Sequence, residues 1–304
     1  MGLPSLPALL TMLIERFAED VVVWAPAKVN LHLEILGKRP DGYHALETLM
    51  VAVNLCDTLV FQDDPSGDLN LRCNSAALSV GPDNLVLRAA ELLRSATGCK
   101  RGAKIRLVKR IPMAAGLAGG STDAAATLAG LNALWQLNLP LEQLAAMSAS
   151  IGSDVAFFFS TPAAWCSGRG EIVTPAALGA KLWLVLACPP FGLSTAEVYK
   201  NVKVPAAPVS GDGIRKVLAE GNVEQIGRLL FNRLEEAATL ARPEIGDYQR
   251  LLESLQPAGA RMSGSGSTLF ALGRNRQDAQ RIAQELQHGP DKRFAQRLYV
   301  VRSV

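Results

Sequence analysis

The segment IPMAAGLAGGSTDAAATLAGLNALW, residues 111–135, has the composition of a phosphate-binding loop. An expected strand ends at its first residues, three glycines follow, and an uninterrupted helical pattern runs from Ala124 to Leu137. Glycines let backbone N–H groups approach a ligand closely, and the free N–H groups at a helix N-terminus favour an anion. The same residues could instead form a tight turn in which Ser121 or Thr122 caps the helix. No lysine follows the glycines as in a Walker loop, and no G-x-G-x-x-G pattern with a downstream acid indicates a dinucleotide fold.

Polar and apolar residues alternate along the expected strand VVVWAPAKVNLHLEIL, residues 21–36. The apolar residues fall on one face, which predicts a half-buried strand. The polar residues fall on the other face and are Lys28, Asn30, His32 and Glu34. We expect His32 and Glu34 to face solvent or to support a site from behind, since His32 has no partner at a metal-ligand spacing.

The chain is long enough for two domains. Its 304 residues exceed the size at which one hydrophobic core usually keeps growing, and its composition, 49% hydrophobic and 19% charged, is that of a globular protein. Expected strands and helices alternate irregularly, without a repeated βαβ rhythm, which favours an α+β fold. We assign residues 21–164 to an N-terminal domain and 165–304 to a C-terminal domain, after an N-terminal extension over 1–20.

Charge and cysteine content limit the partners and the compartment. A net charge of +3 from scattered basic residues suits an anionic small molecule and falls short of a nucleic-acid footprint. The five cysteines form no C-x-x-C pair, so neither a disulfide framework nor a zinc site is indicated and a cytoplasmic protein fits best. The apolar stretch in the extension spans about eleven residues, too short to cross a bilayer. We expect no nucleic acid, no membrane and no obligate protein partner.

Periodicity and turn signals predict the order of the elements. Helices are expected over 83–98, 124–137, 141–152 and 275–287, with several short helical segments within 210–255. Strands are expected over 21–36, 51–62, 103–112, 181–189 and 297–304, with two more strands joined by a glycine loop within 259–273.

Three segments resemble the motifs of the GHMP kinases, the family that includes galactokinase, homoserine kinase, mevalonate kinase and phosphomevalonate kinase. The matching segments, in family order, are APAKVNLHLEI (25–35), PMAAGLAGGSTDAA (112–125) and RMSGSGSTLFAL (261–272). The resemblance implies a two-domain α+β GHMP kinase architecture. Its N-terminal domain would resemble domain 2 of ribosomal protein S5 and bind ATP, and its C-terminal domain would be ferredoxin-like.

A narrower resemblance concerns the substrate. PAKVNLHLEILGKRPDGYHALETLMVAVNLCDTL (26–59) and IGSDVAFFF (151–159) are similar to the family members that act on a cytidine-diphosphate-linked methylerythritol. The resemblance implies an enzyme that uses ATP, with Mg²⁺, to phosphorylate the 2-hydroxyl of that compound in non-mevalonate isoprenoid biosynthesis. The protein ligand of the metal is not readable from the sequence.

The resemblance also implies catalytic and nucleotide-binding residues. Asp154 matches the base that accepts the proton of the attacking hydroxyl, although an aspartate capping a turn is the alternative. Lys28 matches the lysine that lies beside this base and stabilises charge, the alternative being an exposed strand lysine. The expected ATP-binding residues are Pro112, Gly116, Leu117, Ala118, Gly119, Gly120, Ser121 and Thr122.

Substrate-binding residues are implied at three places in the chain. Tyr43 would stack on the cytosine and His44 would read its edge, unless Tyr43 only closes its turn onto the core. Asn30 would form hydrogen bonds with polar groups of the substrate or with Asp154. The remaining candidates are Phe191 and Thr195 on the opposite wall, and Gly264, Ser265 and Gly266 in a second nest of N–H groups that could also be a simple hairpin turn.

Two residues depart from the family pattern, and two other functions compete with the one implied. Ala118 replaces a glycine, which is harmless only if its φ is negative and its methyl group points away from the nucleotide, and Ala156 replaces a proline. The rivals are another GHMP kinase acting on a mevalonate-type or homoserine substrate, and a non-catalytic binding protein on the same fold. The element Asp41-Gly42-Tyr43-His44 suits a cytidine group and argues against the first rival.

Overall fold

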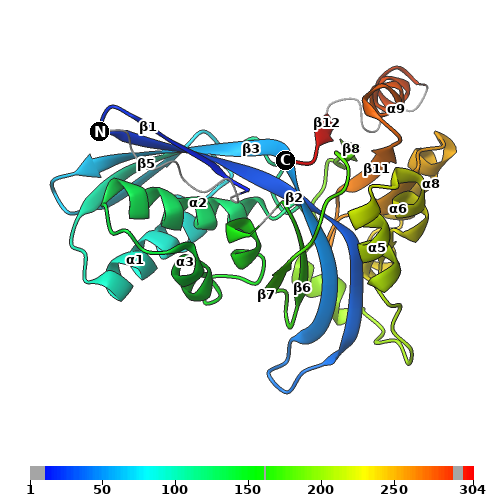
Figure 1. Ribbon diagram of the computed structural model, residues 1–304, viewed down its shortest axis with the longest axis horizontal. Coiled ribbons are helices and arrows are strands. Elements are labelled where there is room, and N and C mark those ends of the chain that lie inside the picture. Colours follow the sequence, from blue (N-terminus) through cyan, green and yellow to red (C-terminus); the bar gives the residue numbers. More distant parts are fainter. Residues whose placement is uncertain (1–10, 161, 290–296) are drawn as a thin grey trace.

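The chain folds into two β-sheets flanked by helices (Figure 1). The structure is a computed structural model and describes residues 11–160, 162–289 and 297–304. In the first sheet the strand order is β1-β2-β3-β5-β4, with β6 pairing with β3, β7 with β6, and β9 with β2. In the second sheet the order is β10-β11-β8-β12.

The strands have the following bounds: β1 Leu13–Phe17, β2 Asp20–Lys38, β3 His44–Asp64, β4 Leu69–Cys73, β5 Gly102–Val108, β6 Ala163–Ser167, β7 Ile172–Pro175, β8 Trp183–Ala187, β9 Phe231–Asn232, β10 Gly259–Met262, β11 Leu269–Gly273 and β12 Leu298–Arg302. The helices are α1 Leu85–Thr97, α2 Gly119–Leu134, α3 Leu141–Ser148, α4 Thr195–Lys200, α5 Asp212–Glu220, α6 Val223–Leu229, α7 Leu234–Ala241, α8 Glu244–Ser254 and α9 Arg276–His288, with a 3₁₀ helix, η1, at Ala156–Phe159.

The first strand was not predicted from the sequence. β1 lies inside the segment expected to be an extension, and it pairs antiparallel with β2 from Leu13 opposite Trp24 to Phe17 opposite Asp20. The sequence gives no signal for this strand because four of its five residues are exposed and the fifth is only partly buried, so no alternation marks a core-facing side. The ordered fold therefore begins before Val21, while residues 1–10 of the expected extension lie outside the described residues.

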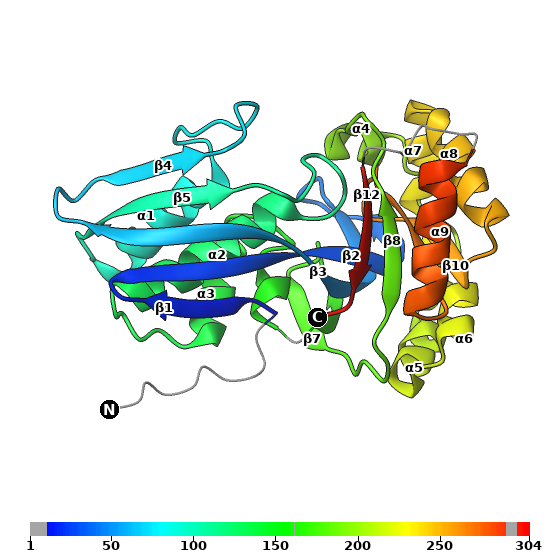
Figure 2. The ribbon, with the colours of Figure 1, turned by 90° about the horizontal axis from the view of Figure 1, so that it is seen from above.

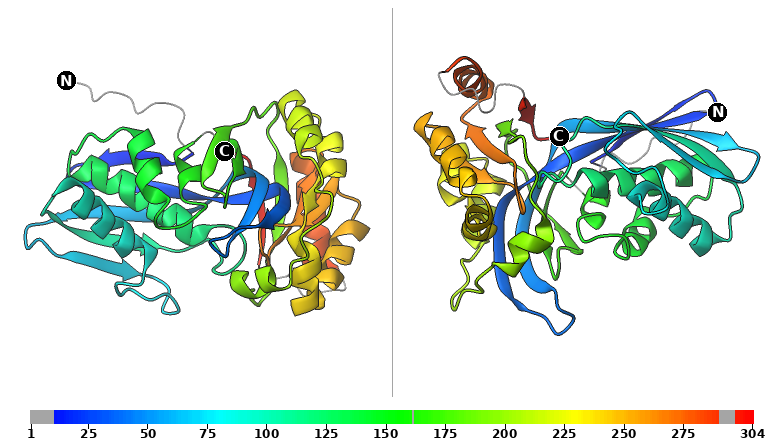
Figure 3. Two further views of the ribbon diagram at one scale, coloured as in Figure 1. Left: turned by 90° about the horizontal axis from the view of Figure 1, so that it is seen from below. Right: turned by 180° about the vertical axis from the view of Figure 1, so that it is seen from behind.

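The antiparallel pair β2 and β3 runs through both halves of the molecule (Figures 1 and 3). Register shifts interrupt β2 after Pro26, Asn30 and Ile35, and such bulges bend a strand and increase its twist. Along one face, successive segments of β2 contribute to three clusters of buried apolar residues. These two strands therefore connect the cores of the two domains directly.

The expectation of a half-buried β2 is wrong. Lys28, Asn30, His32 and Glu34 are each at most 3% exposed. The groups that contact them are the Gly116 carbonyl for Lys28, Ser263 for Asn30, the rings of Trp165 and Phe231 for His32, and Arg233 for Glu34. Glu34 is satisfied by Arg233, whose Nε and Nη2 donate to its two oxygens at 2.7 and 2.6 Å. Alternation alone cannot distinguish a solvent-facing polar row from one that a second domain buries.

Helix α2 is the central helix of the N-terminal domain. It lies with α1 and α3 against one face of the first sheet (Figures 1 and 2), and most of its residues are buried. Its small side chains allow a close approach to the sheet: a Cβ built on Gly130 would lie 2.4 Å from the ring of Phe61. The helix begins at Gly119, earlier than the predicted Ala124, so its first turn includes the glycines of the loop.

The second sheet has the ferredoxin-like topology implied by the sequence. The chain runs β8, helices, β10, β11, α9 and β12, and the strand order β10-β11-β8-β12 places the first strand of this unit beside the last. Helices α8 and α9 lie on its outer side (Figure 2), and its other face packs against the first sheet through residues such as Leu31 and Leu184. The predicted domain boundary at 164–165 falls within β6, which pairs with the first sheet. Within the described residues, no helix combines the length and apolarity needed to cross a bilayer.

Candidate active site

A cavity of about 1440 Å³ opens where the glycine loop before α2 meets the loop between β10 and β11. Both loops, the hairpin between β2 and β3, and the turn between β6 and β7 contribute to its lining. A cavity of this size can hold two ligands of nucleotide dimensions side by side. The site is therefore shared between the two domains.

The two glycine loops contact each other through their backbones. A Cβ on Gly116 would lie 2.0 Å from the carbonyl oxygen of Ser263, and the positive φ of Gly116, 73°, also favours glycine. The Ser263 hydroxyl donates to the Gly116 carbonyl at 3.0 Å, and the Thr268 N–H donates to the Ala115 carbonyl at 3.2 Å. A side chain at position 116 would force the loops apart.

Lys28 lies buried at the point where these segments meet. Its ammonium donates to Asn30 Oδ1 at 2.6 Å and to the Gly116 carbonyl at 3.0 Å, and lies 3.5 Å from Asp154 Oδ2. The Lys28 side chain is 4% exposed and that of Asp154 is 34% exposed. The structure therefore places together the two residues predicted to be catalytic, with the carboxylate accessible from the cavity and the cation held behind it.

Asn30 lines the cavity but has its side-chain groups engaged within the protein. Its oxygen accepts from Lys28, and its amide nitrogen donates to Thr48 Oγ1 at 2.8 Å, which in turn donates to the His32 carbonyl at 2.6 Å. This chain fixes the amide orientation and so the position of the ammonium. The geometry makes Asn30 a positioning residue for Lys28 rather than a partner of Asp154.

The first turn of α2 presents uncapped N–H groups to the cavity. The N-cap residue, Ala118, provides no side-chain hydrogen bond, and the first bond of the helix runs from the Thr122 N–H to the Ala118 carbonyl at 2.9 Å. The preceding N–H groups of Gly119, Gly120 and Ser121 have no partner within the helix, which is the arrangement that binds an anion. The alternative in which Ser121 or Thr122 caps the helix is therefore wrong.

Thr122 does not reach the cavity. It is fully buried, and its hydroxyl has no hydrogen-bond partner among the described residues, whereas the other seven residues predicted to bind ATP line the cavity. The helix begins earlier than predicted, so position 122 turns toward the core instead of the loop surface. Thr122 is removed from the candidate ATP-binding residues.

Ala118 adopts the conformation that its sequence context normally reserves for glycine. Its φ is 55° and its ψ is 32°, in the left-handed region. The expectation that alanine is harmless here required a negative φ, and this requirement is not met. Placing a residue with a Cβ in this region costs about 1 to 2 kcal/mol of conformational free energy. Position 118 thus carries local backbone strain.

The other end of the cavity contains aromatic side chains. Tyr43 is 55% exposed, and the ring of His44 lies 5.4 Å from that of Tyr199, between centroids. Burial, with a further contribution from the negative charge of Asp154, raises the pKa of the Tyr199 hydroxyl above its ordinary value, so it stays protonated as a donor. Tyr199 was not singled out in the sequence, since nothing local relates STAEVYK to Tyr43.

Phe191 does not contribute to the wall of the cavity. Its ring packs against Tyr248 at 6.1 Å and under the guanidinium of Arg242 at 5.4 Å, toward the core of the C-terminal domain. The prediction of Phe191 as the opposite wall is wrong, and Tyr199 occupies that place.

The loop between β10 and β11 lines the side of the cavity next to Lys28. Gly264, Ser265 and Gly266 all line it, and Thr195 joins them through a 2.9 Å hydrogen bond between its hydroxyl and that of Ser265. Asn232 fixes the loop from behind by donating to the carbonyls of Met262 and Gly264, each at 2.8 Å. The cavity therefore includes a second glycine-rich surface from the C-terminal domain.

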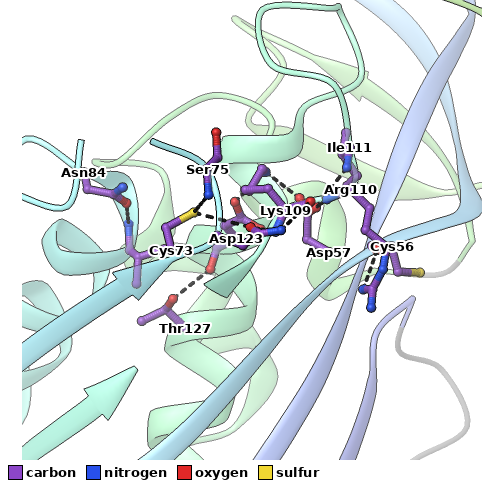
Figure 4. Close-up of polar contacts among 12 residues, drawn as sticks. Cys56, Asp57, Cys73, Ser75, Asn84, Lys109, Arg110, Ile111, Asp123 and Thr127 are labelled. Carbon is purple, nitrogen blue, oxygen red and sulfur yellow. Dashed lines mark hydrogen bonds and ion pairs between the residues drawn. The ribbon is translucent and has the colours of Figure 1, made fainter. Parts of the chain in front are cut away.

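A buried charged cluster lies behind the glycine loop (Figure 4). The Lys109 ammonium forms ion pairs with Asp57 and with Asp123 Oδ2, the latter at 2.7 Å. Asp57 also accepts hydrogen bonds from the backbone N–H groups of Arg110 and Ile111, at 2.6 and 2.9 Å. This cluster ties β3, the end of β5 and α2 together beneath the loop. Sequence reasoning missed it because the three charged residues are far apart in the chain.

Burial and the shared cation shift the proton affinities in this cluster. Burial raises the pKa of Asp123 to about 7, against the lowering effect of the Lys109 ammonium. Burial alone would lower the pKa of Lys109, but the two carboxylates hold it above its ordinary value. Asp123 Oδ1 is buried without a hydrogen-bond partner among the described residues, which also favours the protonated acid.

The described residues contain no group of three or more histidine, cysteine, aspartate or glutamate side chains arranged to hold a metal ion. Mg²⁺ in kinases is commonly held by one or two carboxylates together with the phosphates and water. The donor set of this cavity fits a metal that arrives with a nucleotide better than one held by the protein alone.

Comparison with known proteins defines the class of protein to which this fold and site belong. The model of the GHMP kinases N terminal domain matches residues 84–161, and that of the GHMP kinases C terminal domain matches residues 214–291. Together they cover more than half of the chain. The chain therefore belongs to the GHMP kinase family of small-molecule kinases.

Within this family, the chain is similar to kinases of one particular name. The 4-diphosphocytidyl-2-C-methyl-D-erythritol kinase of Carboxydothermus hydrogenoformans is 42% identical over 282 residues, which are 92% of this chain and 97% of that one. A crystal structure of 4-(cytidine 5′-diphospho)-2C-methyl-D-erythritol kinase superposes with a TM-score of 0.78 at 33% identity, covering 93% and 99% of the two chains. Homoserine kinase from Cytophaga hutchinsonii has a TM-score of 0.72 at 19% identity, covering 96% of each chain, and shares the fold. The predicted two-domain α+β GHMP kinase architecture is confirmed.

Replacing Ala118 with glycine should stabilise the protein. Glycine adopts the left-handed conformation without the Cβ penalty, so Ala118→Gly should raise the free energy of unfolding by about 1 kcal/mol in chemical denaturation. The matched control is Ala126→Gly inside α2, which should lower it by about 1 kcal/mol or more. Equal losses at both positions would show that packing of the Ala118 methyl group outweighs the backbone strain.

The Asp123 carboxyl should make stability depend on pH. An unfolded chain releases this proton near the ordinary pKa of 3.8, whereas the folded protein keeps it until about 7, so the wild type loses stability as pH rises between these values. Asp123→Asn lacks this proton, and its free energy of unfolding relative to the wild type should rise by at least about 1 kcal/mol from about pH 5 to pH 8. The control is Asp63→Asn, which breaks an exposed ion pair with Arg101. Its free energy of unfolding relative to the wild type should change little with pH. A constant or falling difference for Asp123→Asn would mean that Asp123 is ionised throughout.

Proposed function

We propose that this protein transfers the γ-phosphoryl group of ATP to the 2-hydroxyl of 4-diphosphocytidyl-2-C-methyl-D-erythritol. The observation that carries the proposal is the pair formed by Asp154 and Lys28, 3.5 Å apart in a cavity that also contains an uncapped helix N-terminus and an aromatic end. Similarity to kinases named for this substrate, over more than nine-tenths of the chain, supports it. The product would carry a phosphate on the 2-oxygen, with ADP as the second product.

The reaction requires a base, a cation and a site for the phosphates. The Asp154 carboxylate accepts the proton of the 2-hydroxyl as that oxygen attacks the γ-phosphorus, and the bond to the β-phosphate oxygen breaks. Lys28 stabilises the negative charge that develops on the attacking oxygen and on the transferring group. Because Asn30 and the Gly116 carbonyl already fix the ammonium, this stabilisation needs no rearrangement during the reaction.

The N–H groups at the start of α2 hold the ATP phosphates, supported by the loop from Pro112 to Ala118. Mg²⁺, when bound with the nucleotide, would offset the negative charge of the phosphates. Among the described residues that line the cavity, Asp83, Asp123 and Asp154 supply the carboxylates, and only Asp123 is almost fully buried. The metal therefore belongs to the nucleotide in this proposal.

The aromatic end of the cavity receives the cytosine. Tyr43 offers an exposed ring face on which a base can stack, His44 offers a donor and an acceptor to the base edge, and Tyr199 forms the opposite wall. A compact aliphatic alcohol would leave this end empty, which disfavours the rival kinases for mevalonate-type or homoserine substrates. A non-catalytic binding protein would need neither Asp154 nor the buried Lys28.

We further propose a cytoplasmic protein that acts on small molecules without an obligate partner. None of the five cysteines forms a disulfide, which suits a reducing compartment. The modest net charge and the absence of a basic stripe in the sequence argue against nucleic acid as a ligand.

A substrate panel tests the proposal directly. ADP formation should be measured with ATP, Mg²⁺ and, separately, the cytidyl substrate, mevalonate and homoserine. We expect the cytidyl substrate to give the highest kcat/KM by a wide margin. A higher kcat/KM for mevalonate or homoserine would contradict the assignment of the cytidyl substrate. No turnover of any of the three alcohols would favour a non-catalytic binding protein.

Removing the base should affect chemistry more than binding. Asp154→Asn should lower kcat by a factor on the order of 100 or more while the Kd for ATP stays close to the wild-type value, because the amide keeps its shape but cannot accept the proton. Asp212→Asn, an exposed aspartate at the start of α5, is the matched control and should keep the wild-type kcat. An unchanged kcat for Asp154→Asn would remove this residue from the mechanism.

A further inference from the structure

Arg169 lies in the turn between β6 and β7 and lines the same cavity. Hydrogen bonds anchor the turn: the Gly170 N–H donates to the Ser167 carbonyl at 3.0 Å, and the Leu46 N–H donates to the Gly168 carbonyl at 2.9 Å, which ties the turn to β3. The Arg169 side chain is 28% exposed. Its position is therefore set by the sheet and not by a free loop.

The Arg169 turn connects the two ends of the proposed substrate site. The guanidinium carbon of Arg169 lies 4.9 Å from the centre of the Tyr43 ring, where the base is expected. On the other side of the turn, a Cβ built on Gly170 would lie 3.6 Å from Asp154 Oδ1, where the hydroxyl is expected. A substrate that reaches from Tyr43 to Asp154 must pass along this turn.

Arg169 is the cavity cation best suited to a diphosphate. The ammonium groups of Lys28 and Lys109 are already held by carboxylates and other acceptors. Arg169 has a 3.6 Å pairing of its Nε with Glu171 and also interacts with the negative charge of Asp41, but among the described residues no hydrogen bond engages its two terminal nitrogens. Lys38 and Lys200 also line the cavity, but a planar guanidinium matches two phosphate oxygens at once, which an ammonium cannot do.

We propose that Arg169 binds the diphosphate of the nucleoside-diphosphate-linked substrate and thereby selects for it. The assignment rests on the proposed function, since it needs a base at Tyr43 and a reacting hydroxyl at Asp154. The cation–π contact with Tyr43 holds the guanidinium before the substrate arrives, so less side-chain freedom is lost on binding. The terminal nitrogens donate to phosphate oxygens and offset their negative charge.

Comparing cytidine with CDP separates this role from simple support of the Tyr43 ring. Both affinities should be measured by calorimetry, with a non-hydrolysable ATP analogue saturating the nucleotide site. For Arg169→Met we expect the Kd of CDP to rise about 10- to 100-fold and that of cytidine to change less than about 3-fold. Arg169→Lys, which keeps the charge without the fork, should give an intermediate loss for CDP, and KM for the cytidyl substrate should rise while KM for ATP stays constant.

Arg215→Met is the matched control, because Arg215 also covers an aromatic ring, that of Trp165 at 5.1 Å, away from the cavity. It should leave both affinities unchanged. An equal loss of affinity for cytidine and CDP in Arg169→Met would overturn the phosphate assignment while leaving the proposed function intact. Unchanged affinity for both ligands in both Arg169 variants would do the same. A wild-type protein that binds neither cytidine nor CDP would overturn the proposed function and the Arg169 assignment with it.

Discussion

The burial of the Lys28 ammonium is the constraint on which the arrangement of the site depends. A charge removed from water is tolerated only when polar groups surround it, and here they come from separate parts of the chain. Asn30 is on the same strand, the Gly116 carbonyl belongs to the glycine loop, and Asp154 follows α3. Ser263 brings in the C-terminal domain by donating to the same Gly116 carbonyl. Satisfying one cation therefore fixes the relative positions of the glycine loop, Asp154 and the second domain.

The charged cluster behind α2 explains how this loop differs from a P-loop. A Walker lysine reaches over the phosphates, whereas Lys109, which precedes this loop in the chain, is turned inward between Asp57 and Asp123. Its charge is offset before any ligand arrives. The loop is held in shape by an ion cluster on its inner side and presents backbone N–H groups on its outer side, so the proposed phosphate site rests on backbone geometry rather than on a mobile cation.

The parts of the site that the sequence predicted are those encoded by local patterns. The glycine loop, Lys28 and Asp154 each lie in short segments whose residue types restrict the backbone, and the structure brings all three together. Other features arise only when distant elements meet. Tyr199 replaces Phe191 because the direction in which α4 packs is a tertiary property, and the polar face of β2 is buried because a second domain covers it. Helix α2 starts five residues earlier than predicted, which turns Thr122 inward, and helix boundaries are the part of an element that local propensity predicts least well.

The long pairing of β2 and β3, from Val21 opposite Phe61 to Lys38 opposite His44 with three register shifts along it, has a mechanical consequence. Many two-domain enzymes close on their ligands by swinging about a short linker, but here such a swing would have to break ladder hydrogen bonds inside a shared sheet. The shared pairing of β2 and β3 therefore resists a hinge movement between the two halves. We expect ligands to enter and leave through small movements of the turns at the rim of the cavity. We also expect a destabilising change in either half to unfold both halves in one cooperative transition.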